Sequence, residues 1–318
     1  MKILLTTNKT LSNEKGNKWV DSGYYNIYLP LKDLGHEVYF WDTVDPEQPD
    51  YQKVVDNFKP DLIFACITGD LRITPAEQRA VEIISRITQS GNIKTFNWFC
   101  DDSWRFDDWS TIACRFFTCC STSEPSYIQR YKDIGYDNIM VGGWHTNQNF
   151  YPEHELEKKY DVTFIGQTKW SPDRKMYLNF LKEKGINVQV FHGLDQKDMV
   201  EKLCQSKVGI NFSKNYTSVN RGQSYEPKTQ MKLRPFEIAA AKGTMIFSEY
   251  HDGLEHFFDI DKEMVCFEGR SEMLHKIKFI LEKDNIRKKI ARNGNIRFEK
   301  EHSSHQRLKA ILGEISKI

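Results

Sequence analysis

The stretch that decides the fold is Lys232–Tyr250, with the sequence KLRPFEIAAAKGTMIFSEY. It predicts a buried helix that begins at Pro235, continues through small apolar residues and ends at Gly243, followed by a short apolar strand. Proline suits the first helical position because its missing N–H would have no helical partner there. A buried helix that leads directly into a buried strand is typical of an α/β domain with a parallel sheet.

The same alternation extends outward from this stretch in both directions. The helix at 74–91 has Thr74 as its predicted N-cap and Gly91 as its stop. Near-continuous apolar strands of this kind predict doubly wound parallel sheets. The predicted strands are 2–7, 36–42, 59–66, 93–102, 115–122 and 138–144 in the first half, and 160–166, 186–193 and 207–214 in the second.

The length of 318 residues is too great for one ordinary core and predicts two domains. Between Trp144 and Lys159 the chain is polar and without period, so we expect the interdomain linker there. The prediction is therefore a Rossmann-like domain at 1–150 and a second one at 151–318, with a helical tail from Ser271 onward. A polar loop, 215–230, precedes the deciding stretch.

Charge is distributed unevenly between the two halves. Residues 1–150 carry 15 Lys and Arg against 20 Asp and Glu, whereas residues 151–318 carry 30 against 24. The net charges are −5 and +6, in agreement with the total of +1. The second half is therefore the better place for an anionic ligand such as a nucleotide diphosphate.

The N-terminus and the cysteines predict the compartment. The first residues, MKILLTTNKT, contain an apolar run far shorter than a signal-peptide core or a membrane span of about 20 residues. The seven cysteines are an odd number and include no C-x-x-C pair. We expect a cytoplasmic protein with reduced thiols and no transmembrane segment.

Three charged residues stand at the start of the deciding helix. Lys232 and Arg234 precede it, and Glu237 lies in its first turn. One interpretation of Glu237 is a carboxylate that caps the helix. The other is a ligand site, because in open α/β sheets ligands bind where strands end and helices begin. Cations for phosphates and a carboxylate for sugar hydroxyls fit a sugar nucleotide.

The run from Leu233 to Leu312 resembles the C-terminal domain of group 1 glycosyltransferases of the spore-maturation-protein (CgeB-like) type. The similarity comprises, in order, the Arg-x-x-Glu helix start, the Gly before a strand, the loop EYHDGLEHFF, the strand EMVCFEG and the helices around ARNGNIRFEKEHS. The segment YDVTFIGQTKWSPDRKMYL is similar to the opening of that domain. The resemblance implies the GT-B fold, two Rossmann-like domains that face each other across a cleft.

The resemblance also implies a metal-independent transferase that moves a sugar from a nucleotide-diphosphate sugar, with UDP-sugars favoured, to an acceptor hydroxyl. No cofactor is expected, because the nucleotide-sugar donor is itself a co-substrate. Related retaining transferases have another Glu eight positions before Glu237, where this sequence has Thr229. The donor-binding residues that the resemblance and the strand ends imply are Gly166, Lys169, Arg174, Lys232, Arg234 and Glu237. Lys169 and Arg174 are equally well interpreted as solvated surface cations.

Asp101 and Asp102 directly follow an aromatic strand and should emerge at the carboxyl edge of the first sheet. The functional interpretation is that one of them orients or deprotonates the acceptor hydroxyl. The alternative is an Asx turn or a helix cap. Gly23, in the first strand-to-helix loop, and His145, at the domain junction, are further acceptor-side candidates, although a turn glycine and a structural histidine explain them too.

No metal site is predicted. His302 and His305 have helical spacing but no third ligand, which favours a helix junction. The acceptor is unknown, with a glycan, a protein or a small molecule favoured over nucleic acid because the first half is acidic. The alternatives are a transferase acting on modified nucleic acid and an inactive nucleotide-sugar-binding protein. A Rossmann oxidoreductase is disfavoured because no G-x-G-x-x-G follows the first strand.

Overall fold

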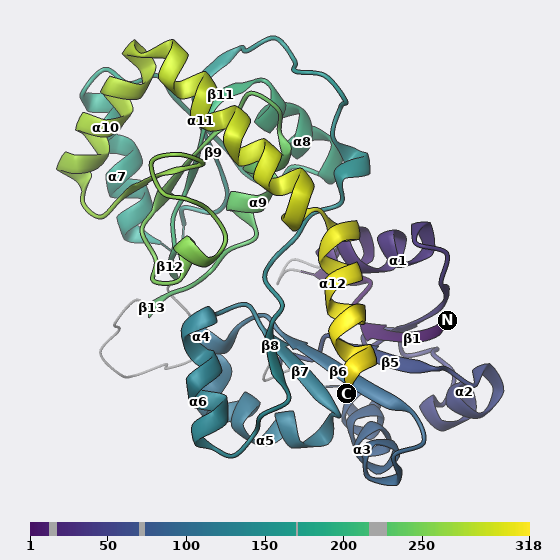
Figure 1. Cartoon of the computed structure of the whole chain (residues 1–318). Coiled ribbons are helices and arrows are strands. Elements are labelled where there is room, and N and C mark those ends of the chain that lie inside the picture. Colours follow the sequence, from purple (N-terminus) through teal and green to yellow (C-terminus); the bar gives the residue numbers. More distant parts are fainter. Residues whose placement is uncertain (13–17, 70–73, 170, 216–227) are drawn as a thin grey trace. The chain divides into compact units, whose positions relative to one another are not determined.

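The computed structural model describes residues 1–12, 18–69, 74–169, 171–215 and 228–318, so most of the predicted polar loop at 215–230 lies outside the described residues. The chain divides into two compact units (Figure 1). Unit 1 comprises Met1–Gly143 together with Ser304–Ile318, and unit 2 comprises Trp144–Ser303.

Unit 1 is built on a six-stranded parallel sheet with the strand order β4-β1-β5-β6-β7-β8. The strands are β1 (Lys2–Thr7), β4 (Glu37–Asp42), β5 (Leu62–Ala65), β6 (Lys94–Phe99), β7 (Cys119–Thr122) and β8 (Ile139–Val141), each within a predicted strand. A short antiparallel hairpin of β2 (Thr10–Ser12) and β3 (Lys18–Val20) was not predicted.

The helices of unit 1 follow the strands as a doubly wound sheet requires. The longest, α3 (Pro75–Ser90), confirms the predicted boundaries, because Thr74 Oγ1 accepts from Glu77 N at 3.0 Å and Gly91 is left-handed with a φ of 69°. The others are α1 (Leu29–Asp33), α2 (Tyr51–Phe58), α4 (Asp102–Arg105), α5 (Thr111–Ala113), α6 (Ile128–Asp133) and α12 (Ser304–Lys317), with short π and 3₁₀ turns at η1 (Tyr24–Tyr28), η2 (Phe106–Ser110), η3 (Cys114–Phe116) and η4 (Pro125–Tyr127).

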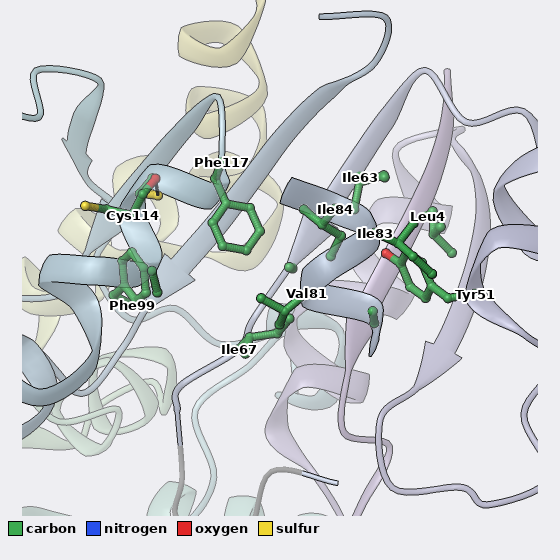
Figure 2. Close-up of a cluster of buried hydrophobic side chains, with 14 of the residues drawn as sticks. Leu4, Tyr51, Ile63, Ile67, Val81, Ile83, Ile84, Phe99, Cys114 and Phe117 are labelled. Carbon is green, nitrogen blue, oxygen red and sulfur yellow. Dashed lines mark hydrogen bonds between the residues drawn. The ribbon is translucent and has the colours of Figure 1, made fainter. Parts of the chain in front are cut away.

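The core of unit 1 lies between the sheet and the helices that cover it. Figure 2 shows part of this cluster, in which Leu4 and Ile63 from the strands meet Ile84 from α3 and Tyr51 from α2. The buried Tyr51 hydroxyl has a hydrogen-bond partner in this apolar core, since it lies 2.7 Å from Thr6 Oγ1. Close packing of this kind holds the strand ends, and the residues that follow them, in one place.

Unit 2 is built on a five-stranded parallel sheet with the order β10-β9-β11-β14-β15. Its strands are β9 (Tyr160–Ile165), β10 (Val188–Phe191), β11 (Ser206–Asn211), β14 (Met245–Glu249) and β15 (Val265–Phe267), and a two-residue antiparallel pair joins β12 (Lys214–Asn215) to β13 (Lys228–Thr229). The helices are α7 (Pro172–Glu183), α8 (Gln196–Cys204), α9 (Arg234–Ala240), α10 (Arg270–Glu282) and α11 (Asp284–Arg297), with short turns at η5 (Gln148–Phe150), η6 (Leu254–His256) and η7 (Phe298–His302).

Helix α9 is the buried helix that the deciding stretch predicts. It begins at Arg234, one residue before the predicted start, and Pro235 occupies its second position. The helix approaches β11 closely because Gly209 has no side chain there. A Cβ at Gly209 would meet Ile238 Cγ1 at 2.8 Å, which is too short for real contacts. The small residues of α9 and Gly209 therefore let the helix lie directly on the sheet.

The C-terminal helix differs from its predicted assignment. The sequence places 271–318 as a tail of the second domain, but α12 packs on α1 and η1 and belongs to unit 1. Its apolar face is buried, with Leu308 fully buried and Ile311, Leu312 and Ile315 less than a tenth exposed. Lys94 Nζ also donates to the carbonyl of Ile315 at 3.2 Å. An apolar helix face of this size has to be buried against other apolar residues, and those residues belong to unit 1.

The predicted linker likewise belongs to one unit. The unit boundary falls after Gly143, and the residues from Trp144 onward are part of unit 2. Trp144 Nε1 donates to the carbonyl of Met231 at 3.0 Å, and Thr146 forms a bridge with Ser303. Within the described ranges, no helix is both long and apolar enough to cross a membrane.

Candidate active site

A buried ion pair lies at the start of α9, on the side of the unit 2 sheet where the parallel strands end. Arg234 Nη1 is 2.6 Å from Glu237 Oε2, three residues further along the helix, and Glu237 is only 5% exposed. Burial raises the pKa of Glu237, while the positive charge of Arg234 opposes this rise. The structure therefore brings together two of the predicted donor-binding residues in a single charged pair.

A second ion pair lies at the same edge and involves residues that the sequence did not single out. Glu249, at the end of β14, is 4% exposed, and its Oε1 lies 2.9 Å from Lys214 Nζ. Its Oε2 accepts from the backbone N–H of Lys214 at 3.0 Å. Burial, the largest single influence, lowers the pKa of Lys214, but the hydrogen bond to Glu249 and the negative charge of Glu249 together raise it above its usual range.

Lys214 also connects this pair to two predicted positions. Arg174, from α7, donates through Nη2 to the carbonyl of Lys214 at 2.9 Å. Thr229, which stands where related transferases have a further Glu, is paired with Lys214 in the β12–β13 ladder. Lys214 therefore contacts both Thr229, its partner in the strand ladder, and the buried carboxylate of Glu249.

The remaining predicted donor residues occupy the loops around these pairs. Gly166 follows β9 and donates its N–H to the carbonyl of Phe191 at 2.9 Å. Lys169 is exposed in the loop before α7. Lys232 is half-buried, and its Nζ donates to Gln230 Oε1 at 2.7 Å. All three belong to unit 2.

In unit 1 the adjacent residues Asp101 and Asp102 have different surroundings. Asp101 is half-buried, and its carbonyl accepts the N–H of Arg105 at 2.9 Å at the start of α4. Asp102 is 1% exposed, and its Oδ2 accepts from the Tyr131 hydroxyl at 2.8 Å. Burial raises the pKa of Asp102 to about 7, against hydrogen bonds that lower it. Asp101 is thus the accessible member of the two.

Asp21 lies near Cys100, as Asp101 does, and was not predicted as a site residue. Its Oδ1 accepts from the N–H of Gly23, the acceptor-side candidate, at 2.7 Å, and burial raises its pKa. A hydrogen bond with Cys66 raises the pKa of the Cys100 thiol, and burial and the nearby carboxylates of Asp101 and Asp21 add to the effect. The carboxyl edge of the unit 1 sheet therefore gathers two carboxyl groups and two thiols.

The histidine candidates do not form a metal site. His145 is 2% exposed and lies in unit 2 rather than in the acceptor-side unit to which the sequence assigned it. His302 is buried against Phe236, and its Nε2 lies 2.6 Å from the carbonyl of Phe257, which makes it a packing residue at the predicted helix junction. His305 pairs with Asp33 at 3.2 Å. Across the described part of the chain, no group of three His, Cys, Asp or Glu side chains is arranged to hold a metal ion.

Comparison with known proteins identifies the family. A glycosyl transferase-like family model matches residues 150–313, more than half of the chain. The chain belongs to the glycosyl transferase-like family. The match covers both buried ion pairs of this glycosyltransferase, and the predicted enzyme class is confirmed. No curated protein sequence matches significantly.

Solved structures confirm the GT-B fold of this glycosyltransferase. Anabaena HepE (Alr3699), in complex with UDP and glucose, aligns over 100% of both chains with 11% identity and a TM-score of 0.64. The β-glucosyltransferase of T4 phage, in complex with UDP-glucose, aligns over 99% of both chains with 14% identity and a TM-score of 0.60. Staphylococcus aureus TarM, in complex with UDP, aligns over 80% of this chain and 55% of its own, with 10% identity and a TM-score of 0.55.

Sequence reasoning about this glycosyltransferase missed Lys214, Glu249 and Asp21. A signal existed for the first two, since Lys214 follows β11 and Glu249 ends β14, at the edge of the second sheet where α/β proteins bind ligands. For Asp21 the signal was weaker, because it lies in a polar loop whose path past the first strand is not apparent from the sequence. Its position next to Cys100 depends on tertiary packing.

Proposed function

We propose that this glycosyltransferase moves a sugar from a nucleoside-diphosphate sugar, with UDP-sugars favoured, to an acceptor hydroxyl. The observation that carries the proposal is the buried Arg234–Glu237 pair at the carboxyl edge of unit 2, within the segment that matches the family model. A UDP donor is supported by the three fold neighbours that hold UDP or UDP-glucose.

In this proposal, unit 2 binds the donor. Arg234 and Lys232 stabilise the negative charge that develops on the leaving diphosphate, and Lys169 and Arg174 add to that stabilisation from the loop and helix after β9. The Glu237 carboxylate accepts hydrogen bonds from ribose or sugar hydroxyls, and the positive charge of Arg234 opposes the rise in its pKa that burial causes. Gly166 lets the backbone approach the diphosphate, as a glycine after a strand end permits.

Unit 1 supplies the acceptor-side chemistry. Asp101 is the proposed group that orients or deprotonates the acceptor hydroxyl, because it is half-buried whereas Asp102 is 1% exposed. Asp102 then acts through its hydrogen bond with Tyr131 to hold the start of α4, and Gly23 shapes the neighbouring loop. His145 remains a candidate that acts from unit 2. The proposed acceptor is a glycan, a protein or a small molecule.

Two finer features of the proposal are metal independence and the CgeB-like subtype. Metal independence is supported by the number of cations at the unit 2 edge, since Arg174, Lys214, Lys232 and Arg234 offer the positive charge that a divalent ion would otherwise supply. The CgeB-like subtype is supported by the ordered run of motifs from Leu233 onward. We place the protein in the cytoplasm.

The test is a thermal-shift and hydrolysis screen against UDP-, GDP-, ADP- and TDP-sugars, with and without EDTA. One nucleotide class should stabilise the protein and be hydrolysed slowly in the presence of EDTA. Glu237→Gln, which keeps the shape of the side chain, should lower turnover about 100-fold. The exposed Glu183→Gln is the matched control and should leave turnover unchanged. Loss of turnover with EDTA would refute metal independence, and no response to any donor would refute the transferase proposal.

A further inference from the structure

An apolar cavity of about 430 Å³ lies in unit 2 away from the two buried ion pairs. It is bounded by α10 and α11, which pack against each other, and by β15 and the loop before it. The apolar lining consists of Val265, Phe279, Ile280, Ile286 and Ile290. This wall is hydrocarbon, so the cavity suits an apolar ligand rather than a sugar or a phosphate.

Two of the lining side chains are large, apolar and open to solvent. Phe279 on α10 is 49% exposed, and Ile286 at the start of α11 is 42% exposed. A surface helix of a globular protein normally turns polar residues outward at such positions. Because both side chains border one cavity, they form a single apolar patch, and such patches mark binding surfaces.

The hairpin that carries this patch is strongly basic. Arg270–Arg297, the α10–α11 hairpin, contains nine Lys and Arg against three Asp and Glu, a net charge of +6 in a chain whose total is +1. Six of the cations are exposed: Arg270, Lys278, Lys283, Lys288, Lys289 and Arg292. Lys289 follows Ile286 by three residues on α11 and shares a helix face with it, and Lys283, directly after α10, follows Phe279 by four residues.

We propose that the α10–α11 hairpin docks on an anionic lipid bilayer. The exposed cations approach the lipid phosphates, while Phe279 and Ile286 enter the boundary between headgroups and acyl chains, with hydrocarbon from a lipid filling the cavity between them. A lipid is favoured over nucleic acid because a phosphate backbone satisfies the cations but leaves the apolar patch and cavity in water. This surface is independent of the proposed donor site.

The test is co-flotation of the full chain with vesicles of phosphatidylcholine alone or with one third phosphatidylglycerol. Binding should require the anionic lipid and weaken with salt. Ile286→Ser and Phe279→Ser should each lower the apparent affinity about tenfold. Ile112→Ser, which removes an isoleucine that is 59% exposed in unit 1, is the matched control and should have no effect. Lys283→Glu with Lys289→Glu should lower binding at least about tenfold.

Thermal unfolding of each variant separates loss of binding from loss of folding, and these exposed positions should leave the melting temperature within about 2 °C of the parent. Absence of flotation with anionic vesicles would overturn the proposal. Flotation that Phe279→Ser and Ile286→Ser weaken no more than Ile112→Ser does would also overturn the proposal. Binding of a DNA duplex that is lost in the Lys283→Glu, Lys289→Glu variant but retained in Phe279→Ser, without flotation, would assign the hairpin to nucleic acid instead.

Discussion

In unit 2 the buried carboxylates of Glu237 and Glu249 each face a cation, Arg234 at 2.6 Å and Lys214 at 2.9 Å. In unit 1 the buried carboxyl of Asp102 faces the hydroxyl of Tyr131 instead, and burial raises its pKa to about 7. Both groups stand where the strands of a parallel sheet end, so architecture alone does not set their ionisation. The partner differs: burial raises the pKa of both Glu237 and Asp102, and only at Glu237 does the positive charge of a neighbouring Arg oppose that rise.

The difference assigns different chemistry to the two edges. The ion pairs of the unit 2 edge place cations where an anionic donor would bind. At the unit 1 edge, burial raises the pKa values of Asp102 and Asp21, which lie beside the proposed acceptor-side residues Asp101 and Gly23. The following substitutions test this comparison.

The largest effect is expected from Arg234→Met, which leaves Glu237 buried without its cation. The free energy of unfolding of unit 2 should fall by about 4 kcal/mol, because breaking a buried pair leaves an uncompensated charge. Urea unfolding, monitored by hydrogen exchange, measures this loss of stability, and the exposed Arg86→Met is the control. The double variant with Glu237→Gln should recover most of the loss. If Arg234→Met is as stable as the control, the Arg234–Glu237 ion pair does not stabilise the unit 2 edge.

The next largest loss of stability tests which unit the C-terminal helix α12 packs in. Leu308→Ala removes a fully buried side chain from α12 and should cost about 3 kcal/mol through the cavity that it leaves. Hydrogen exchange should accelerate in α1 of unit 1 and not in β9 or β14 of unit 2. Lys309→Ala, at the exposed neighbouring position, is the control. Faster exchange confined to unit 2 would show that the helix belongs there.

The unit 1 edge should respond to pH. A folded-state pKa of about 7 lies above the ordinary value of 3.8 for Asp102, so the folded state binds the extra proton between these values. Its contribution to stability is present at low pH and is lost as pH rises to about 7, by roughly 3 kcal/mol between pH 5 and pH 8. Asp102→Asn should remove this part of the pH dependence, measured by urea unfolding at both pH values. Asp108→Asn, at an exposed neighbour, should keep it; equal slopes in parent and Asp102→Asn would contradict a raised pKa.

A smaller effect is expected from Lys214→Met. The cost should be about 2 kcal/mol, less than for Arg234, because the backbone N–H of Lys214 still donates to Glu249. Lys214→Arg should restore most of it, since a guanidinium also pairs with a carboxylate. Lys207→Met is the control, because its pair with Asp161 is more exposed and should contribute less than about 1 kcal/mol. A loss in the control as large as that in Lys214→Met would show that burial does not separate these pairs.

The strands of both sheets were predictable from local patterns. Runs such as 62–65 and 245–247 are apolar without interruption, which only a strand buried on both faces requires. The ends of α3 were predictable for the same local reason, since Thr74 and Gly91 act on their own helix. The Arg234–Glu237 pair could also be anticipated, because a spacing of three residues on a helix brings two side chains together.

The contacts between distant segments were not predictable in this way. Lys214 and Glu249 are 35 residues apart, and only the pairing of β11 with β14 brings their ends together. Asp102 and Tyr131 are 29 residues apart, so burial and the raised pKa follow from packing rather than from the Asp-Asp motif itself. The two adjacent aspartates looked equivalent as sequence and differ because one side chain points into the core.

By itself, the sequence determined two parallel α/β sheets, a glycosyltransferase-like second half and the charged start of α9, because strand burial, helix caps and short spacings are local properties. Only the tertiary structure decided that α12 belongs to unit 1, that Glu249 joins the unit 2 edge through Lys214, and which carboxyl groups face a cation. Those outcomes depend on long-range packing, since the ionisation of a buried group is set by the atoms around it and not by its neighbours in the chain.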